Sequence, residues 1–141
     1  MALRTAKAVW NGDLRGGDGQ MRFGGGAFEG AYSFESRFEE GEGTNPEELI
    51  AAAHAGCFSM AFSGALGGAG YDPERVSTEA RVSLVKGDDG FFINRIQLVT
   101  QASVPGIDEA EFQEIAEAAK KGCPVSKALA GPEITVDATL L

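Results

Sequence analysis

The sequence predicts an α+β fold arranged around one long apolar helix. The stretch from Leu49 to Tyr71 contains no formally charged residue, and Asn45 and Pro46 just before it are typical of a helix start. Segments with alternating polar and apolar residues lie before and after this helix and do not alternate regularly with helices. The expected order of elements is therefore βββ-α-ββ-αα-β.

The composition predicts one domain over residues 1–141, long enough to bury a core. The net charge of −9 argues against nucleic acid and against anionic membrane surfaces as partners. Two cysteines, Cys57 and Cys123, and a single histidine, His54, are too few for a disulfide scaffold or a zinc site.

Three short strands are expected before the long helix, over residues 4–10, 20–23 and 31–38, with glycine-rich turns between them. In the third, aromatic residues alternate with polar ones. That alternation places Arg37 on the face opposite the aromatic side chains. An acidic, glycine-containing loop over residues 39–44 leads to the helix.

The central helix is expected to run for about twenty residues, or roughly 30 Å, and to stop among the glycines of 67–70. Glu47 and Glu48 lie where carboxylates favour the positive helix end. The helix lacks a polar face, so it has to be covered on every side.

A membrane span is the alternative for this apolar stretch. Acidic flanks, the absence of a Lys/Arg cluster beside it and its Ala, Gly and Ser content favour a buried helix of a soluble protein. The chain opens Met-Ala-Leu-Arg without a basic and apolar leader, so a cytoplasmic location is expected.

The rest of the chain predicts a hairpin, two helices and a closing strand. Gly87-Asp88-Asp89-Gly90 provides the hairpin turn, and Asp108 with Glu111 resembles a capping box. The expected ranges are 76–86 and 91–104 for the hairpin strands, 108–122 and 123–130 for the helices, and 134–140 for the last strand.

The two cysteines suit a reversible dithiol–disulfide couple. Taken alone, Cys57 is better explained as a small buried apolar residue, the usual fate of a free cysteine. Cys123, however, follows a glycine at a helix start, where the helix dipole favours a thiolate. In peroxide reduction one thiolate attacks the O–O bond and becomes a sulfenic acid, and a second thiol condenses with it to a disulfide.

Such an attack requires a cation to stabilise charge, and a carboxylate to hold that cation. Arg37 and Glu47 are the candidate pair, although a solvated strand arginine and a helix-start carboxylate explain them as well. His54 lies three residues before Cys57 and is either a base or, as we expect, a histidine that packs the helix.

Glu47 and Cys57 are ten residues apart on one expected helix, which is about 15 Å along its axis. They cannot touch within one chain. If they share a site, a second subunit brings Glu47, with Arg37, to Cys57. A two-fold dimer of antiparallel central helices would do this and would also cover the apolar helix.

Five motifs, Trp10–Gly12, Gly43–Leu49, Ala52–Met60, Val104–Ile107 and Gly122–Ser126, are spread over nearly the whole chain. With these motifs the sequence resembles the OsmC/Ohr family of thiol peroxidases, essentially from end to end. The resemblance is closer to the OsmC branch, because Arg37 stands in Ser-Arg-Phe-Glu and His54 replaces a tyrosine common in Ohr proteins. Gly56, where many members have alanine, is a minor departure.

The resemblance implies antiparallel sheets wrapped around a buried central helix, in an intertwined homodimer with two interface active sites. Cys57 would be the peroxidatic thiol, Cys123 the resolving thiol, and Arg37 with Glu47 the activating pair. It implies reduction of organic hydroperoxides without metal, haem or flavin, with electrons from a dithiol such as a lipoylated protein.

Two alternatives to a peroxidase follow from the same residues. One is a non-enzymatic redox sensor or dimeric binding protein on the same scaffold. The other, a thiol hydrolase, is disfavoured because His54 is the sole histidine.

Overall fold

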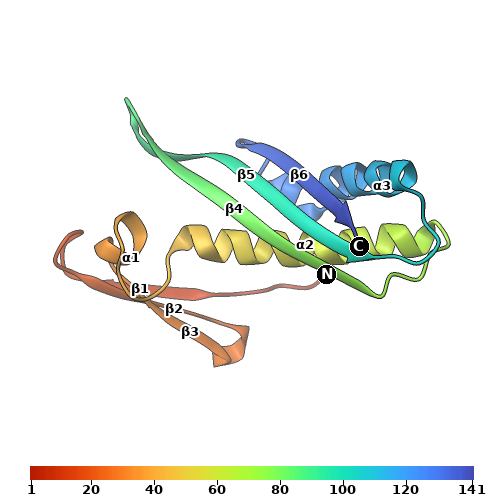
Figure 1. The fold of residues 1–141 in the computed structure, drawn as a ribbon. Coiled ribbons are helices and arrows are strands. Elements are labelled where there is room, and N and C mark those ends of the chain that lie inside the picture. Colours follow the sequence, from red (N-terminus) through yellow and green to blue (C-terminus); the bar gives the residue numbers. More distant parts are fainter. The chain divides into compact units, whose positions relative to one another are not determined.

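The computed structural model of the chain describes residues 1–141 and forms two units, Met1–Leu49 (unit 1) and Ile50–Leu141 (unit 2). Each unit contains one three-stranded sheet, drawn in Figure 1. The mixture of sheets and helices confirms the expected α+β class, and most elements lie within a few residues of their expected positions.

Unit 1 is built on the antiparallel sheet β1-β2-β3. Its strands are β1 (Lys7–Asn11), β2 (Asp18–Phe23) and β3 (Phe28–Tyr32). Gly19 pairs with Trp10 on one side and with Tyr32 on the other, and the two rings lie 5.3 Å apart, centroid to centroid. A Cβ at Gly19 would come within 2.4 Å of the Tyr32 ring. Glycine is therefore required where these rings cover the sheet.

The expected third strand over 31–38 is wrong after Tyr32. The strand ends at Tyr32 and a short helix, α1 (Phe34–Phe38), follows. The reason is a capping box: Ser33 Oγ accepts from the Ser36 N–H at 3.1 Å, and Ser36 Oγ accepts from the Ser33 N–H at 2.8 Å. Phe34 and Phe38, four residues apart, then lie on one helix face with their rings in tilted contact. Arg37 consequently lies in the last turn of α1.

Helix α2 (Pro46–Gly68) starts and ends as expected. The Asn45 side chain caps it by accepting from the Glu48 N–H at 2.9 Å, and Gly70, with a φ of +93°, follows its end. By length and composition α2 is also apolar enough to cross a membrane. A core helix of a soluble protein meets the same criterion.

Only one stripe of α2 is buried within the chain, which corrects the expectation of cover on every side. The buried residues recur every four positions, at His54, Phe58, Phe62 and Leu66. The opposite stripe, Ala52, Gly56, Met60 and Gly64, is exposed. Within unit 2, α2 therefore has a strip of exposed Ala, Gly and Met side chains.

Unit 2 contains the sheet β4-β5-β6. Its strands are β4 (Arg75–Gly87), β5 (Gly90–Ser103) and β6 (Glu133–Leu140). The first two form the expected antiparallel hairpin, whose end extends past β6 in Figure 1. β6 runs parallel to β5, so the expectation of purely antiparallel sheets is wrong. The two helices between β5 and β6 provide the crossover that a parallel pair requires.

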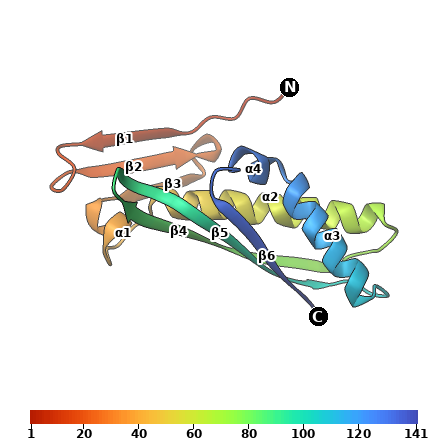
Figure 2. The ribbon, with the colours of Figure 1, turned by 90° about the horizontal axis from the view of Figure 1, so that it is seen from above.

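The core of unit 2 lies between this sheet and the helices α2 and α3 (Glu109–Gly122). Figure 2 shows both helices on the same side of the sheet. The Phe62 ring lies between those of Phe58 and Phe112, at centroid distances of 5.5 and 5.2 Å. Asp108 caps α3 by accepting from the Glu111 N–H, and α4 (Pro124–Ala128) follows after Cys123.

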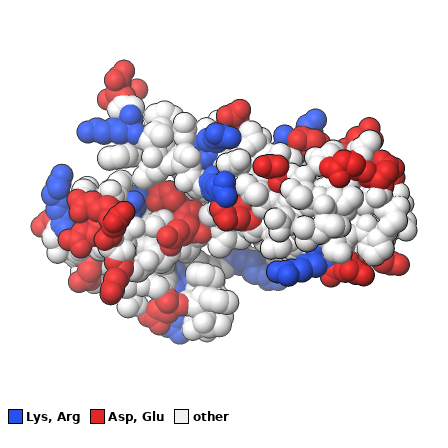
Figure 3. Space-filling view, viewed as in Figure 1, with Lys and Arg blue, Asp and Glu red and all other residues white.

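Acidic side chains are spread over the face drawn in Figure 3, with Lys and Arg side chains scattered between them. This agrees with the net charge of −9. The face shown has no extended basic surface of the kind that binds a phosphate backbone.

Candidate active site

The two cysteines lie against each other in unit 2. The Cys57 sulfur comes from α2, and the Cys123 sulfur from the junction of α3 and α4; the two sulfurs are 2.8 Å apart. Both thiols are free. Cys57 is partly exposed, whereas Cys123 is 0% exposed. A small shift would thus join them, and a molecule from solvent reaches Cys57 first.

The surroundings of the two sulfurs act on their pKa values in opposite directions. Burial raises the pKa of the Cys57 thiol, the Cys123 thiol raises it further, and the Val125 N–H lowers it. Burial also opposes ionisation of Cys123, but hydrogen bonds from Cys57, from Ser126 and from the Val125 N–H together lower its pKa. No cation is among the groups that shift the pKa of Cys57. Within the chain, the groups around Cys57 therefore favour its neutral thiol.

His54 lies in the buried stripe of α2 and is 0% exposed. Its Nε2 is 2.7 Å from Ser126 Oγ, and its Nδ1 has no hydrogen-bond partner. Burial lowers the pKa of His54, so the ring is neutral at physiological pH. This agrees with the expected packing histidine, which here has one polar contact.

Arg37 and Glu47 form an ion pair in unit 1. Arg37 Nη2 donates to Glu47 Oε1 at 2.8 Å, and Arg37 Nε lies 3.2 and 3.3 Å from the two carboxylate oxygens. The Glu47 side chain is 11% exposed and that of Arg37 is 36% exposed. Glu47 engages the Nε and Nη2 edge of the guanidinium and leaves Nη1 for another ligand.

The chain around this ion pair is held by short-range hydrogen bonds. Ser36 Oγ donates to the Thr44 carbonyl oxygen at 2.7 Å, and Asn45 Nδ2 donates to the Ser36 carbonyl oxygen at 3.0 Å. These bonds fasten the acidic loop to α1. Arg37 at the end of α1 and Glu47 at the start of α2 are thereby fixed relative to each other.

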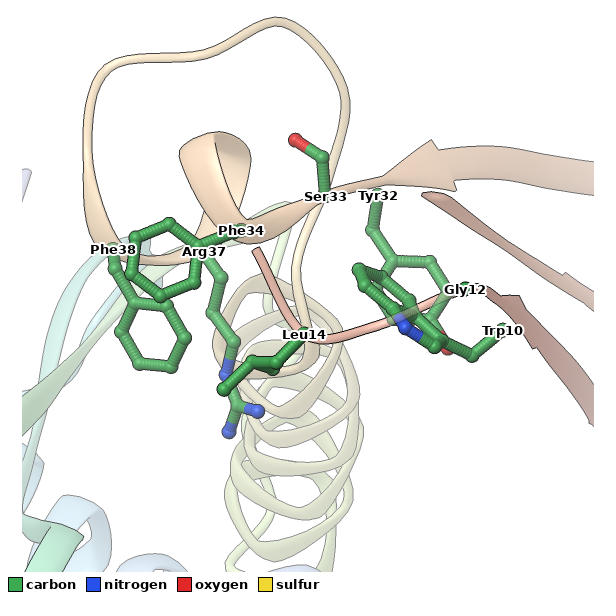
Figure 4. Close-up of a pocket in the computed structure, with 8 residues that line it drawn as sticks. All are labelled: Trp10, Gly12, Leu14, Tyr32, Ser33, Phe34, Arg37 and Phe38. Carbon is green, nitrogen blue, oxygen red and sulfur yellow. The ribbon is translucent and has the colours of Figure 1, made fainter. Parts of the chain in front are cut away.

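A cavity of about 380 Å³ lies beside Arg37 in unit 1 and is lined mainly by aromatic residues. In Figure 4 the Phe34 and Phe38 rings lie on one side and Trp10 and Tyr32 on the other, with Leu14 and the Arg37 side chain between them. The Ser33 hydroxyl points away from the cavity. The cavity therefore offers apolar surface next to one guanidinium.

The structure thus pairs the four expected site residues two by two, Cys57 with Cys123 and Arg37 with Glu47, each pair in its own unit. Sequence reasoning missed the contact between His54 and Ser126. The signal was present, because His54 interrupts an otherwise apolar stripe at spacing four. It also missed the cavity, which brings Trp10 of β1 to the aromatic residues around α1.

The chain is similar in sequence to known proteins. The family model described as OsmC-like protein matches residues 39–138. The chain is 49% identical over 135 residues to the peroxiredoxin OsmC of Escherichia coli strain K12, covering 95% of this chain and 94% of that protein. It is 36% identical over 104 residues to the organic hydroperoxide resistance protein of Xanthomonas axonopodis pv. citri strain 306, covering 71% and 67%.

The fold is likewise similar to solved structures. The organic hydroperoxide resistance protein OhrB of Bacillus subtilis superposes with a TM-score of 0.73 at 29% identity, covering 99% of this chain and 100% of that one. An OsmC protein from Legionella pneumophila gives a TM-score of 0.70 at 27% identity, covering 99% and 98%. From the matched residues and the shared fold, the chain is a member of the OsmC family.

Proposed function

We propose that this protein is a cysteine-based peroxidase that reduces organic hydroperoxides to alcohols. The observation that carries the proposal is the sulfur pair, one partly exposed and one buried, 2.8 Å apart. The names of its relatives, a peroxiredoxin and an organic hydroperoxide resistance protein, support the same activity.

In the first step the Cys57 thiolate attacks the terminal oxygen of the hydroperoxide. The O–O bond breaks, Cys57 becomes a sulfenic acid, and the alkoxide leaves and takes a proton to give the alcohol. Cys123 then attacks the Cys57 sulfur, expels hydroxide and forms the disulfide. A dithiol donor reduces that disulfide; we propose a lipoylated protein in this role.

Arg37 and Glu47 are proposed to act on Cys57 of a second chain. Ten residues of helix separate Glu47 from Cys57, or about 15 Å along the α2 axis. A homodimer with antiparallel α2 helices would bring the guanidinium to the thiolate. The exposed strip supports such packing, since three of its members, Ala52, Gly56 and Gly64, are small and let two helices approach closely.

The cavity beside Arg37 supports a preference for organic substrates. Its aromatic lining would bury the apolar tail of an organic hydroperoxide while the guanidinium stabilises the departing oxygen. Hydrogen peroxide has no such tail and gains nothing from that surface. No metal or organic cofactor is needed for this chemistry, and we propose that it takes place in the cytoplasm.

Counting free thiols after one equivalent of cumene hydroperoxide tests the proposal. Loss of both thiols for one hydroperoxide consumed per chain, followed by turnover with a dithiol donor, is expected. The close sulfur pair also suits a redox sensor, which would form the disulfide without turnover. Absence of turnover with every dithiol tried would therefore contradict the enzyme and favour the sensor.

A further inference from the structure

We infer that Arg15 is a specificity-determining residue, which makes the cavity of unit 1 prefer organic hydroperoxides that carry a carboxylate. The inference rests on the proposed function and narrows its substrate class. It assigns a role to a residue outside the four expected site residues, in the loop between β1 and β2.

Arg15 lies beside two residues that line the cavity. Its neighbour in the chain, Leu14, is one of them, and Phe34 is the other. The guanidinium carbon of Arg15 is 4.7 Å from the centre of the Phe34 ring. Figure 4 shows Leu14 and Phe34 in the group of side chains around the cavity. Arg15 therefore adds a positive charge to the apolar surface that these residues form.

The charge of Arg15 has no counter-ion within the chain. The ion pairs of the structure are made by three other basic residues, Arg37, Arg81 and Lys120. The carboxylate of the same loop, Asp13, accepts from the backbone N–H groups of Arg15 and Gly16, at 2.9 and 2.7 Å. The contact with Phe34 is with the face of a ring and occupies no N–H group. The guanidinium donors of Arg15 thus stay available for a planar acceptor such as a carboxylate.

The loop that carries Arg15 is held by hydrogen bonds of its own. The Asp13 carbonyl oxygen accepts from Trp10 Nε1 at 3.1 Å and from the Gly17 N–H at 3.0 Å. Trp10 is itself a lining residue, so the first of these bonds joins the loop to a wall of the cavity. The backbone that positions Arg15 is therefore ordered before a substrate binds, which lowers the entropy cost of binding.

The two arginines near the cavity contact different rings of α1. Arg15 lies against Phe34, and the guanidinium carbon of Arg37 is 5.1 Å from the centre of the Phe38 ring. The two rings are 4.9 Å apart. Glu47 already neutralises Arg37, whereas the charge of Arg15 is unpaired. A substrate that lies along the two rings would direct its O–O group to Arg37 and pair its carboxylate with Arg15.

The charge of the whole chain decides how much this cation matters. With 21 acidic and 12 basic residues, the chain as a whole repels anions. A neutral hydroperoxide can bind the aromatic lining without Arg15, but an anionic one needs a local positive charge to offset that repulsion. Arg15 should therefore change the selectivity between acids and neutral esters. The carboxylate itself does not react, and the O–O bond breaks as in the proposed function.

The test compares a hydroperoxide acid with its own methyl ester. 4-Carboxycumene hydroperoxide and its methyl ester share the reacting group and the benzene ring and differ in charge. Each is added to reduced protein, and the loss of free thiols after rapid quenching gives a second-order rate constant. We expect the acid-to-ester ratio of rate constants to fall about three- to tenfold in Arg15→Gln relative to the wild type. Comparing ratios cancels the intrinsic reactivity of the two compounds.

Two further variants serve as controls. Arg15→Lys keeps the charge and should retain most of the wild-type ratio. Arg22→Gln removes the same charge from an exposed residue of β2 that does not line the cavity, and should leave the ratio unchanged. Sodium chloride should lower the wild-type ratio, because salt screens an exposed ion pair. Thermal unfolding of each variant checks the fold.

Equal ratios in the wild type and Arg15→Gln would overturn the inference. An equal fall of the ratio in Arg22→Gln would also overturn it, because only the net charge would then matter. If Arg15→Gln slowed the ester as much as the acid, Arg15 would have a structural role and the inference would be wrong.

Binding without chemistry separates this inference from the peroxidase proposal. Trp10 is the sole tryptophan of the chain and lines the cavity, so its fluorescence reports on occupancy. The ratio of affinities for 4-isopropylbenzoate and its methyl ester should also fall in Arg15→Gln. If this fall is observed but no hydroperoxide is reduced, only the peroxidase proposal fails. If hydroperoxides are reduced and neither ratio depends on Arg15, only the role of Arg15 fails.

Discussion

Cys57 and Cys123 have different environments although their sulfurs are in contact. Cys123 is buried among donors that favour its thiolate, whereas Cys57 is partly exposed and burial raises the pKa of its thiol. Exposure favours Cys57 as the sulfur that meets the peroxide. Its ionisation then depends on a cation, and Arg37 with its Glu47 partner is the candidate.

Replacing Arg37 tests this dependence. In Arg37→Ala the pKa of Cys57 should rise, so peroxide attack should slow at neutral pH by at least tenfold and recover in part above the new pKa. Glu47→Ala keeps the positive charge of Arg37 but no longer holds the guanidinium in place, so the peroxidase rate should be low at every pH. Alkylation rate against pH, beside the peroxidase rate, separates the two. A Cys57 titration unchanged in Arg37→Ala would exclude the arginine.

At the scale of elements, sequence reasoning predicted the helices and the hairpin whose ends carry capping or turn residues. Asn45 and Asp108 cap α2 and α3 as expected, and Gly87 and Gly90 close the hairpin. The strand predicted from the alternating pattern over 31–38 was wrong because Phe34 and Phe38 also fit one helix face. The capping box at Ser33 stabilises the helix there. The parallel β6 was missed because strand pattern does not encode direction.

The contacting phenylalanine rings between the unit 2 helices and sheet should dominate the stability of that unit. Phe62→Ala removes a fully buried ring that contacts Phe58 and Phe112, and should lower the free energy of unfolding by about 3–5 kcal/mol. Phe92→Ala is the matched control, because that ring is 52% exposed. Its cost should stay within about 1 kcal/mol. Urea denaturation measures both, and equal losses would contradict this account of the core.

At the scale of the whole molecule, we propose that the functional protein is a homodimer and not a single chain. The buried stripe of α2 packs on the sheet, while 22% of the apolar stretch of this helix is buried in total. Sequence reasoning predicted a second subunit from the Glu47–Cys57 separation, and that subunit remains part of the proposal. Sequence reasoning could not foresee which stripe is left open, because the α2 sequence is apolar all round and burial is set by Phe58, Phe62 and Leu66 meeting the core.

The proposed dimer makes a prediction about Ala52. If Glu47 of one chain faces Cys57 of the other on antiparallel helices, Ala52, midway between them, faces its own copy. Ala52→Glu would place two like charges at the two-fold axis and should dissociate the dimer and reduce peroxidase activity. Ala118→Glu, an exposed helical alanine on α3, is the control and should change neither. Sedimentation at micromolar concentration measures the oligomeric state, and a monomeric wild type would contradict the proposed dimer.

The central claim is that Cys57 meets the peroxide and Cys123 resolves it. Its most direct test is mass spectrometry of the wild type, Cys57→Ser and Cys123→Ser after cumene hydroperoxide at increasing ratios. We expect a disulfide in the wild type, no reaction in Cys57→Ser, and in Cys123→Ser a Cys57 sulfenic acid that overoxidises to sulfinic acid. Oxidation of Cys123 before Cys57, or peroxidase activity in Cys57→Ser, would contradict the account.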